Sequence, residues 1–329
     1  MATPSKKSHT AHTAVKKDEK KTSSLAQSDE KKVQTVLAEK TESKTEARVE
    51  KVSESSSKNS AKANKALTFF LGTTAVVFVA LWLILSTVVY VTAPSMVFDG
   101  YKRSQDSLTS IAAEPVFVGN KAGEKVSLRV VKGSTDSAVL YLPDVTGATG
   151  DMISQLFQYN NESKGTLIIA SYPGYDASEG APSFDNSLEA AELAYKYIVD
   201  AGVKEENIII FGHGFGGIPA TYLASQKSAA KKLVLVNTPA SLQSACFRSF
   251  SIFCAFEGTR WNTSEYAKKV ETPTYIFHTR TDKVVPFSEG EQLKKAFDDA
   301  KKAKSIQFNP IDGEQSTHAY FNVSTVLAN

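Results

Sequence analysis

Cysteine is scarce in this sequence, with only Cys246 and Cys254 among 329 residues. The two form no CxxC pair and no Cys/His group, so neither a metal site nor a metal cofactor is predicted, and no other cofactor is expected. Their spacing is compatible with a disulfide in an oxidising compartment and equally with two buried thiols.

Aromatic residues are absent from the first 65 residues, which are rich in Lys, Glu, Ser, Thr and Ala. Such a segment buries too little apolar surface to offset its chain entropy, so residues 1–65 are predicted to be a disordered, charged tail. The tail is basic and is expected to be solvated, with weak contact to anionic lipid heads as the alternative. No aromatic residues are interleaved with its basic ones, so no nucleic-acid partner is predicted.

Charge is absent between Lys65 and Asp99, and residues 66–91 are apolar throughout. A helix of that length crosses a hydrocarbon core about 30 Å thick. Apolar residues fall on every face, which argues against a buried core helix, and the run lies too far from the N-terminus for a cleaved signal peptide. The sequence therefore predicts a transmembrane signal anchor with the lipid bilayer as its partner.

The orientation of this anchor follows from its flanks. Five basic residues, Arg48, Lys51, Lys58, Lys62 and Lys65, precede the span, against Lys102 and Arg103 after it. The positive-inside rule then predicts a single-pass type II protein with a cytosolic N-terminus and a lumenal or extracellular domain. Three sequons beyond the span, at Asn161, Asn262 and Asn322, agree with that orientation and predict a glycoprotein.

Residues 92–329 are expected to form one α/β domain. Residues 125–131 and 137–143 read as neighbouring strands, and further strands are expected at 166–172, 207–212, 232–237, 274–280 and 305–310. A helix is expected over 187–200. Short strands that alternate with helices predict a mostly parallel sheet covered on both faces, with sites beyond the carboxyl ends of the strands.

The strand end at Gly212 to Gly217, "GHGFGG", has no nucleophile. As a literal GxGxxG it would cradle a dinucleotide, but several strands precede it and no acidic residue ends the next strand. As a nucleophile elbow, GxSxG, it carries Gly214 where serine is expected. Asp282 and His318 then follow later strands in the chain order of a catalytic acid and base.

From about Val126 to His318 the chain resembles α/β-hydrolases of the serine-aminopeptidase-like class, and especially membrane-anchored bud-emergence-protein-like hydrolase-domain proteins. The resemblance rests on "SYPGYDASEGAPSFDNSLEAAELAYKYI", on the elbow "GHGFGGIPATYLAS", and on "VETPTYIFHTRTDKVVPFSEGEQL". It implies the α/β-hydrolase fold and hydrolysis of esters, thioesters or peptides, with Asp282 and His318 as acid and base. Phe215, Val145 and Asp144 match the positions that line the oxyanion site.

Two departures from that family predict a loss of catalysis. Gly214 offers no side chain for attack, and removal of a serine nucleophile costs roughly a millionfold in turnover. Pro143 and Asp144 stand where relatives carry His-Gly, and an ionised carboxylate near the oxyanion would oppose its charge. Glycine also relieves the strain of the elbow. The sequence thus predicts a pseudoenzyme that binds an acyl or peptide ligand or a protein partner near Gly214, Pro143 and His318.

Two alternatives stay open at this stage. A displaced nucleophile would make the chain an active hydrolase, and the candidates are Ser171, Ser178, Ser183, Thr146 and Thr149. A structural membrane-contact protein, whose domain only binds other proteins, is the third reading. The segment 241–261 lies where the fold inserts a lid, and its Phe residues are expected to pack on the core or to line a ligand groove.

Overall fold

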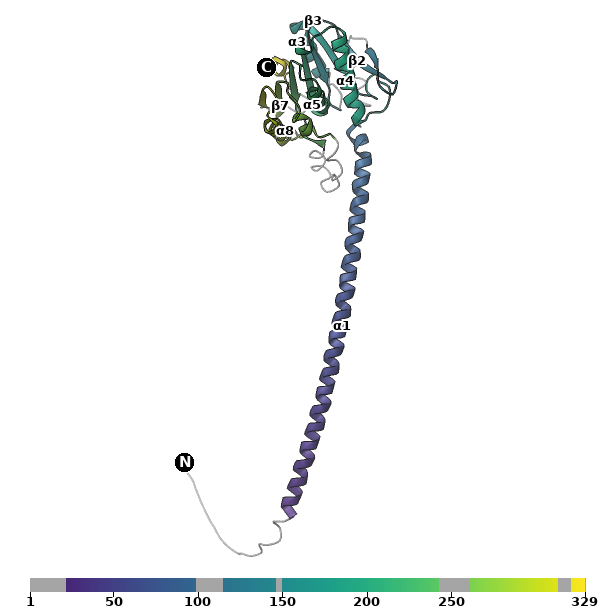
Figure 1. The fold of residues 1–329 in the computed structure, drawn as a ribbon, viewed down its shortest axis with the longest axis vertical. Coiled ribbons are helices and arrows are strands. Elements are labelled where there is room, and N and C mark those ends of the chain that lie inside the picture. The colour runs from purple at the N-terminus through teal and green to yellow at the C-terminus, as the bar shows by residue number, and fades with distance from the viewer. Residues whose placement is uncertain (1–21, 99–114, 146–149, 243–260, 313–320, 329) are drawn as a thin grey trace, which may run out of the picture. The chain divides into compact units, whose positions relative to one another are not determined.

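The computed structural model describes residues 22–98, 115–145, 150–242, 261–312 and 321–328. The chain divides into two compact units, residues 1–79 and 80–329. Figure 1 shows one long helix and a folded α/β domain. His318, Thr146, Thr149, both cysteines and most of the expected lid lie outside the described residues.

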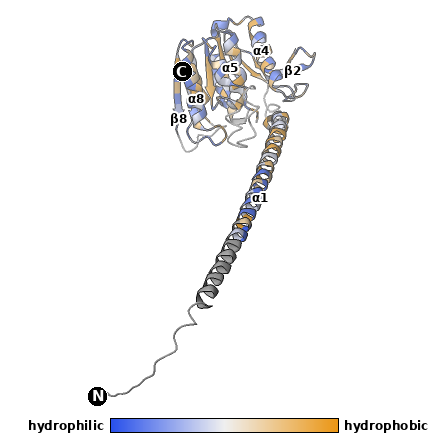
Figure 2. Cartoon of the chain, turned by 60° about the horizontal axis from the view of Figure 1, so that its bottom comes forward, coloured by the Kyte–Doolittle hydropathy of each residue, from blue (hydrophilic) through white to orange (hydrophobic). Residues whose placement is uncertain are grey.

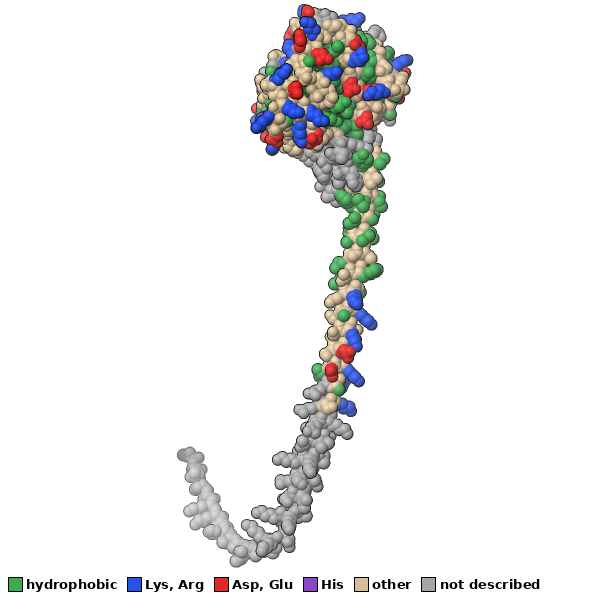
Figure 3. All heavy atoms as spheres, viewed as in Figure 1, with side chains coloured by type: hydrophobic (Ala, Val, Ile, Leu, Met, Phe, Trp, Pro, Cys, Tyr) green, Lys and Arg blue, Asp and Glu red, His purple; other side chains and the backbone are tan. Residues whose placement is uncertain are grey.

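The long helix α1 runs from Thr22 to Val97. It therefore includes residues 22–65, for which composition predicts a disordered tail. Lys, Glu and Ala favour helix, and Lys58 and Glu54 form an i,i+4 ion pair at 2.5 Å, an arrangement that adds a few tenths of a kcal/mol. Among the described residues α1 is the one helix long and apolar enough to cross a membrane. Its apolar part carries exposed hydrophobic side chains, and its preceding turns carry charged ones (Figure 3). The hydropathy of α1 along the chain follows the same division (Figure 2).

Eight strands form one mixed sheet with the order β1-β2-β4-β3-β5-β6-β7-β8. The strands are β1 (Pro115–Gly119), β2 (Lys125–Val131), β3 (Ser134–Leu142), β4 (Gly165–Ala170), β5 (Ile208–His213), β6 (Lys232–Val236), β7 (Thr274–Thr279) and β8 (Ile306–Ile311). All pairings from β4 to β8 in this order are parallel. Strand β2 is antiparallel to both of its neighbours, β1 and β4. The prediction of a mostly parallel sheet is confirmed.

The expectation that 125–131 and 137–143 are neighbouring strands is wrong, because β4 lies between β2 and β3. The chain crosses from β2 to β3 at Gly133, where a Cβ atom would lie 1.9 Å from the Gly165 carbonyl oxygen. Only glycine permits so close a crossing, and the crossing allows β4 to pair with both strands.

Helices cover both faces of the sheet, as predicted. One face packs against α4 (Phe184–Asp200), α5 (Gly217–Gln226) and α8 (Phe287–Ala300), and the other against α3 (Gly150–Ser163) and α9 (Val323–Ala328). The short helix α7 (Thr263–Ala267) contacts α5 and α8. Alternation along β3 explains the two cores, since Leu140 faces the α4 side and Tyr141 the α3 side.

Candidate active site

The elbow follows β5 at the carboxyl edge of the sheet. Gly214 to Gly216 form a single 3-10 turn between β5 and α5. Gly214 has φ of 53°, a left-handed conformation that costs a non-glycine residue about 1–3 kcal/mol. The backbone therefore has the tight, positive-φ turn of a nucleophile elbow, with glycine at its tip.

Flanking glycines let the turn approach the sheet. A Cβ atom on Gly216 would lie 2.1 Å from the Leu142 carbonyl oxygen, and one on Gly217 would lie 1.9 Å from Thr238 Oγ1. Both distances are far below van der Waals contact. The turn thus lies against the backbone at the end of β3 and against the Thr238 side chain after β6, and neither contact leaves room for a Cβ atom.

The backbone N–H that follows the elbow tip donates a hydrogen bond to a carboxylate. The Phe215 N–H donates to Asp144 Oδ1 at 2.8 Å, and Asp144 is only 4% exposed. In an acyl-transfer site this N–H donates to the oxyanion of the tetrahedral intermediate. Here the N–H is already hydrogen-bonded to the Asp144 side chain.

Two tyrosines hold the loop that presents Asp144. Tyr172 Oη donates to the Pro143 carbonyl at 2.8 Å, and Tyr175 Oη donates to the Val145 carbonyl at 3.0 Å. Burial first, and then the charge of Asp144, raise the pKa of both phenols above the ordinary value. The two hydroxyls therefore stay protonated and act as donors, which fixes Pro143 to Val145 beside the elbow.

Asp282, the expected acid, lies in the turn after β7 and is 7% exposed. Its Oδ1 accepts from the N–H groups of Val284 at 2.8 Å and Val285 at 2.9 Å. These bonds orient a buried carboxylate near the carboxyl edge of the sheet. Its expected partner, His318, is outside the described residues, so the pairing of acid and base stays a prediction.

Six aromatic side chains pack into a buried cluster beside the elbow. Phe215 packs against Tyr172, Trp261 and Phe98, with ring centroids 5.9, 4.1 and 5.5 Å away. Tyr175 and Phe184 complete this aromatic cluster, and both contact Phe98. The elbow thus lies against an apolar, aromatic part of the core, and the pocket predicted near Gly214 stays a prediction.

Sequence reasoning missed Phe98. It follows α1 directly, is 1% exposed, and belongs to the same core cluster as Phe215. A single phenylalanine after an apolar span carries no sequence signal of its own, because any span is rich in such residues. The residue nevertheless fastens the segment after α1 into the domain.

Sequence reasoning also missed a buried ion pair in the loop after β4. Arg129 Nη2 lies 2.6 Å from Asp176 Oδ1, and Ser127 Oγ donates to Asp176 Oδ2 at 2.7 Å. Burial raises the pKa of Asp176, but the bonds from Arg129 and Ser127 outweigh burial and lower it overall. Asp176 has φ of 49°. The pair anchors this strained loop to β2.

Among the displaced-nucleophile candidates, two have structural roles. Ser178 Oγ accepts from the Ser127 N–H at 2.8 Å, and Ser183 caps α4 by accepting from the Asn186 N–H at 3.1 Å. Ser171 is 1% exposed, and its Oγ has no hydrogen-bond partner among the described residues. A serine nucleophile needs a base within hydrogen-bond reach. Because His318 lies outside the described residues, the displaced-nucleophile alternative stays a prediction.

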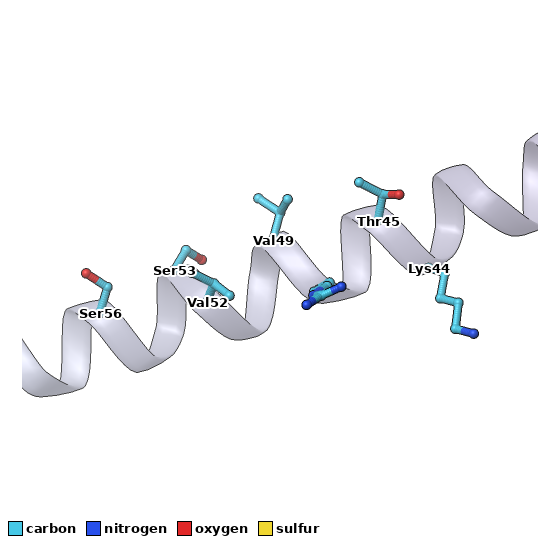
Figure 4. A pocket seen from close by; sticks show the side chains of 7 residues that line it. Lys44, Thr45, Val49, Val52, Ser53 and Ser56 are labelled. Carbon is cyan, nitrogen blue, oxygen red and sulfur yellow. The ribbon is translucent and has the colours of Figure 1, made fainter.

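The described surface grooves do not coincide with the elbow. One runs along α1 from Lys44 to Ser56, and Figure 4 shows its side chains spread around a single helix. Another lies between α4 and α5 and is lined by paired charges such as Lys196 and Asp200. A groove on one helix has no opposing wall, and neither feature carries the convergent polar groups of a ligand site.

The residues that are described fit neither a metal nor a dinucleotide. They contain no cluster of three metal-ligating side chains. At the glycine turn, a pyrophosphate would meet the Asp144 carboxylate that accepts from Phe215. The negative charges of a pyrophosphate and of the Asp144 carboxylate would repel each other, so the geometry does not favour the dinucleotide reading of GxGxxG.

Comparison with known proteins identifies the fold. The phospholipase/carboxylesterase family model matches residues 174–324, a range that includes Gly214, Asp282 and His318. The chain is similar to the human alpha/beta hydrolase domain-containing protein 17B, with 29% identity over 155 residues, or 44% of this chain and 49% of that protein. The chain spans about half the length of the curated relatives it matches.

Solved structures agree on the architecture. An esterase from Pyrococcus furiosus superposes with a TM-score of 0.54 at 14% identity, over 67% of this chain and 87% of that one. Est1E from Butyrivibrio proteoclasticus, solved with ferulic acid, gives a TM-score of 0.53 at 15% identity, over 64% of this chain and 94% of that one. Identities this low carry the fold alone. The domain has the α/β-hydrolase fold, and its matches support a place in the α/β-hydrolase superfamily.

Proposed function

We propose that this chain, a protein with the α/β-hydrolase fold, is a membrane-anchored pseudoenzyme of the serine-aminopeptidase-like type that binds a ligand or partner at its elbow. One observation carries the proposal, namely the 2.8 Å hydrogen bond from the Phe215 N–H to Asp144. It adds a second obstacle to catalysis beside the glycine at position 214. The apolar part of α1 supports the membrane anchor.

Electrostatics gives the reason why Asp144 matters. The rate of acyl transfer depends on donors that stabilise the oxyanion as it forms, and the loss of one donor costs about a hundredfold to a thousandfold in turnover. Asp144 both occupies a donor and brings a negative charge to the place where charge must develop. A serine placed at position 214 would therefore form a tetrahedral intermediate whose oxyanion is repelled by the Asp144 carboxylate.

The proposed ligand would contact the elbow beside the aromatic cluster. The cluster is apolar, and Asp144 and the hydroxyls of Tyr172 and Tyr175 are the polar groups next to it. Apolar walls with a few fixed polar groups are typical of ligand sites. An acyl or peptide ligand with a hydrophobic side group fits this chemistry. The matches support the superfamily, and the narrower kinship to bud-emergence-protein-like hydrolase-domain proteins is part of this proposal.

Labelling with a fluorophosphonate probe tests the loss of catalysis. We expect the full-length wild type to stay unlabelled, and Gly214→Ser to label slowly because its oxyanion is opposed. The double variant Gly214→Ser/Asp144→Gly should label about 100- to 1000-fold faster than Gly214→Ser, the value of one restored donor. His318→Ala in the double variant should abolish that gain.

A matched control separates charge from occupancy of the donor. Gly214→Ser/Asp144→Asn removes the charge but keeps an acceptor oxygen beside Phe215, so its labelling should fall between the other two variants. Labelling of the wild type that disappears in Ser171→Ala would contradict the proposal and support an active hydrolase with a displaced nucleophile.

A further inference from the structure

Lysines gather at the edge of the sheet opposite Gly214, where β6, β7 and β8 begin. The three strands are parallel neighbours in register, with Leu233 beside Thr274 and Thr274 beside Ile306. Hydrogen bonds join their leading segments, since Thr272 Oγ1 donates to the Lys227 carbonyl at 3.3 Å and the Lys304 N–H donates to the Glu271 carbonyl at 3.0 Å. The lysines at this edge, here called the start-edge lysines, are Lys227, Lys231, Lys269, Lys301, Lys302 and Lys304.

Helix stabilisation accounts for only part of this group. Lys227 and Lys301 are the C-caps of α5 and α8, where a cation complements the helix dipole. Lys231, Lys302 and Lys304 lie beyond the helix ends and are exposed. The surplus of charge is therefore not explained by capping.

The charge of this edge is poorly compensated. None of the start-edge lysines forms an ion pair within the described part of the chain, whereas Lys268, Lys294 and Lys295 beside them do. Carboxylates do lie close by. Glu271 is exposed, Glu192, Asp200 and Glu205 line one groove together with Lys227, and Asp298 and Asp299 are already paired with Lys294 and Lys295. Six lysines without an ion pair among the described residues thus gather at this edge of a chain whose net charge is only +3. The Lys231 charge also contributes, after burial, to a lowered pKa of Lys232.

We propose that the start-edge lysines form a docking surface for an acidic polypeptide segment of a partner protein. The surface lies at the far edge of the sheet from the elbow, so a partner bound here leaves the elbow accessible. The inference does not depend on whether the elbow is catalytic.

The composition of the surface favours an acidic polypeptide over other anions. Its basic residues are all lysines, which act as hydrated point charges and lack the planar fork with which arginine grips phosphate. Lys227 Nζ lies 5.7 Å from the Tyr195 ring, but that ring is only 1% exposed and offers no platform on which nucleic-acid bases could stack. The exposed large hydrophobic residues of the described domain, Phe117 and Val284, lie elsewhere, so the surface also lacks the apolar side chains that insert into a membrane.

Binding of a fluorescein-labelled octaglutamate peptide tests the proposal. The full-length protein is held in nanodiscs of neutral phosphatidylcholine, and anisotropy is measured between 50 and 200 mM salt. The variant Lys269→Gln/Lys302→Gln/Lys304→Gln should bind about tenfold more weakly than wild type, the size expected when three surface ion pairs are lost together. Affinity of the wild type should fall steadily with salt.

The matched control carries Lys121→Gln/Lys125→Gln/Lys283→Gln, three exposed lysines near the carboxyl edge. It has the same net charge and the same N-terminal tail as the test variant, and it should stay within about twofold of wild type. Carbodiimide cross-linking with peptide mapping should place the peptide on the start-edge lysines. An equal loss of octaglutamate affinity in both triple variants would overturn the proposal. Binding to anionic vesicles that needs the start-edge lysines, without binding to octaglutamate, would overturn it as well. All substituted lysines are exposed, and circular dichroism checks that both variants fold.

Discussion

At the scale of single residues, the proposed loss of catalysis depends on Gly214 and Asp144. In that proposal Gly214 leaves the elbow without a nucleophile, and Asp144 accepts the hydrogen bond of the Phe215 N–H. Either change alone would leave part of the acyl-transfer machinery in place. Together they explain why a single back-substitution at position 214 is expected to recover little activity.

Lys232 gives a pH-dependent prediction at this scale. It is 7% exposed, and its Nζ donates to the Leu327 carbonyl at 2.8 Å. Burial, with a smaller contribution from Lys231, lowers its pKa from 10.5 to about 8. Between these values the unfolded chain holds a proton that the folded chain releases. The free energy of unfolding should therefore rise with pH in this window, by no more than about 1.4 kcal/mol per pH unit.

The measurement is urea unfolding at pH 7.5, 8.5 and 9.5 for the wild type and for Lys232→Met, which keeps the apolar stem. The difference between the two should follow the sign given above, because other groups titrate equally in both. Parallel pH profiles for the two proteins would show that Lys232 keeps its ordinary pKa.

At the scale of elements, the elbow depends on how closely α5 approaches the sheet. A Cβ atom at Gly216 would lie 2.1 Å from the Leu142 oxygen. Gly216→Ala should therefore push the turn away from β3 and lower the free energy of unfolding by about 1–3 kcal/mol or more. Chemical denaturation measures this loss.

Gly119→Ala is the control for that variant, because nothing lies within 4 Å of the added methyl group. Its effect should stay within about 0.5 kcal/mol of wild type. A similar loss in both variants would point to a general cost of alanine rather than to the contact between Gly216 and Leu142.

The loop after β4 depends on the ion pair between Arg129 and Asp176. Arg129→Met leaves a buried carboxylate without its partner and should cost about 3–5 kcal/mol. Arg129→Met/Asp176→Asn removes the charge as well and should recover most of the loss, since asparagine also tolerates positive φ. Thermal and urea unfolding distinguish the two.

Acid unfolding gives an independent check on this pair. The pKa of Asp176 is lowered in the folded state, so its contribution to stability is present above the unfolded pKa and is lost as pH falls through the folded pKa. The single Arg129→Met variant should lack this acid-dependent loss. If both variants unfold like wild type at every pH, the pair contributes no net stability.

At the scale of the whole molecule, the proposed topology places the domain on the lumenal or extracellular side. Asn161 and Asn322, two of the three sequon residues, are exposed in the folded domain. Digestion with an N-glycosidase should therefore increase the gel mobility of protein expressed in a eukaryotic cell. The shift should vanish when all three sequon asparagines are replaced by glutamine.

A mobility unchanged by the enzyme would remove this support for the orientation. Protease treatment of sealed vesicles then decides the topology. If the tail is cytosolic, the protease digests it while the lumenal domain survives.

Much of this architecture could be predicted from the sequence. The apolar run, the alternation of strands and helices, and the empty nucleophile position are local patterns, and local patterns report burial and chain direction. Strand order was harder to predict, since the placement of β4 between β2 and β3 depends on the close approach of Gly133 and Gly165.

The sequence by itself determined that position 214 of the predicted elbow is glycine and that Asp144 follows an earlier predicted strand. Only the tertiary structure decided where that carboxylate points, because Asp144 and Phe215 are 71 residues apart and meet through the packing of β3 against β5. Only the tertiary structure likewise brings Phe98 into the aromatic cluster and the start-edge lysines to one edge of the sheet. Periodicity specifies which face of an element is buried, but contacts between distant segments exist only once the sheet has assembled.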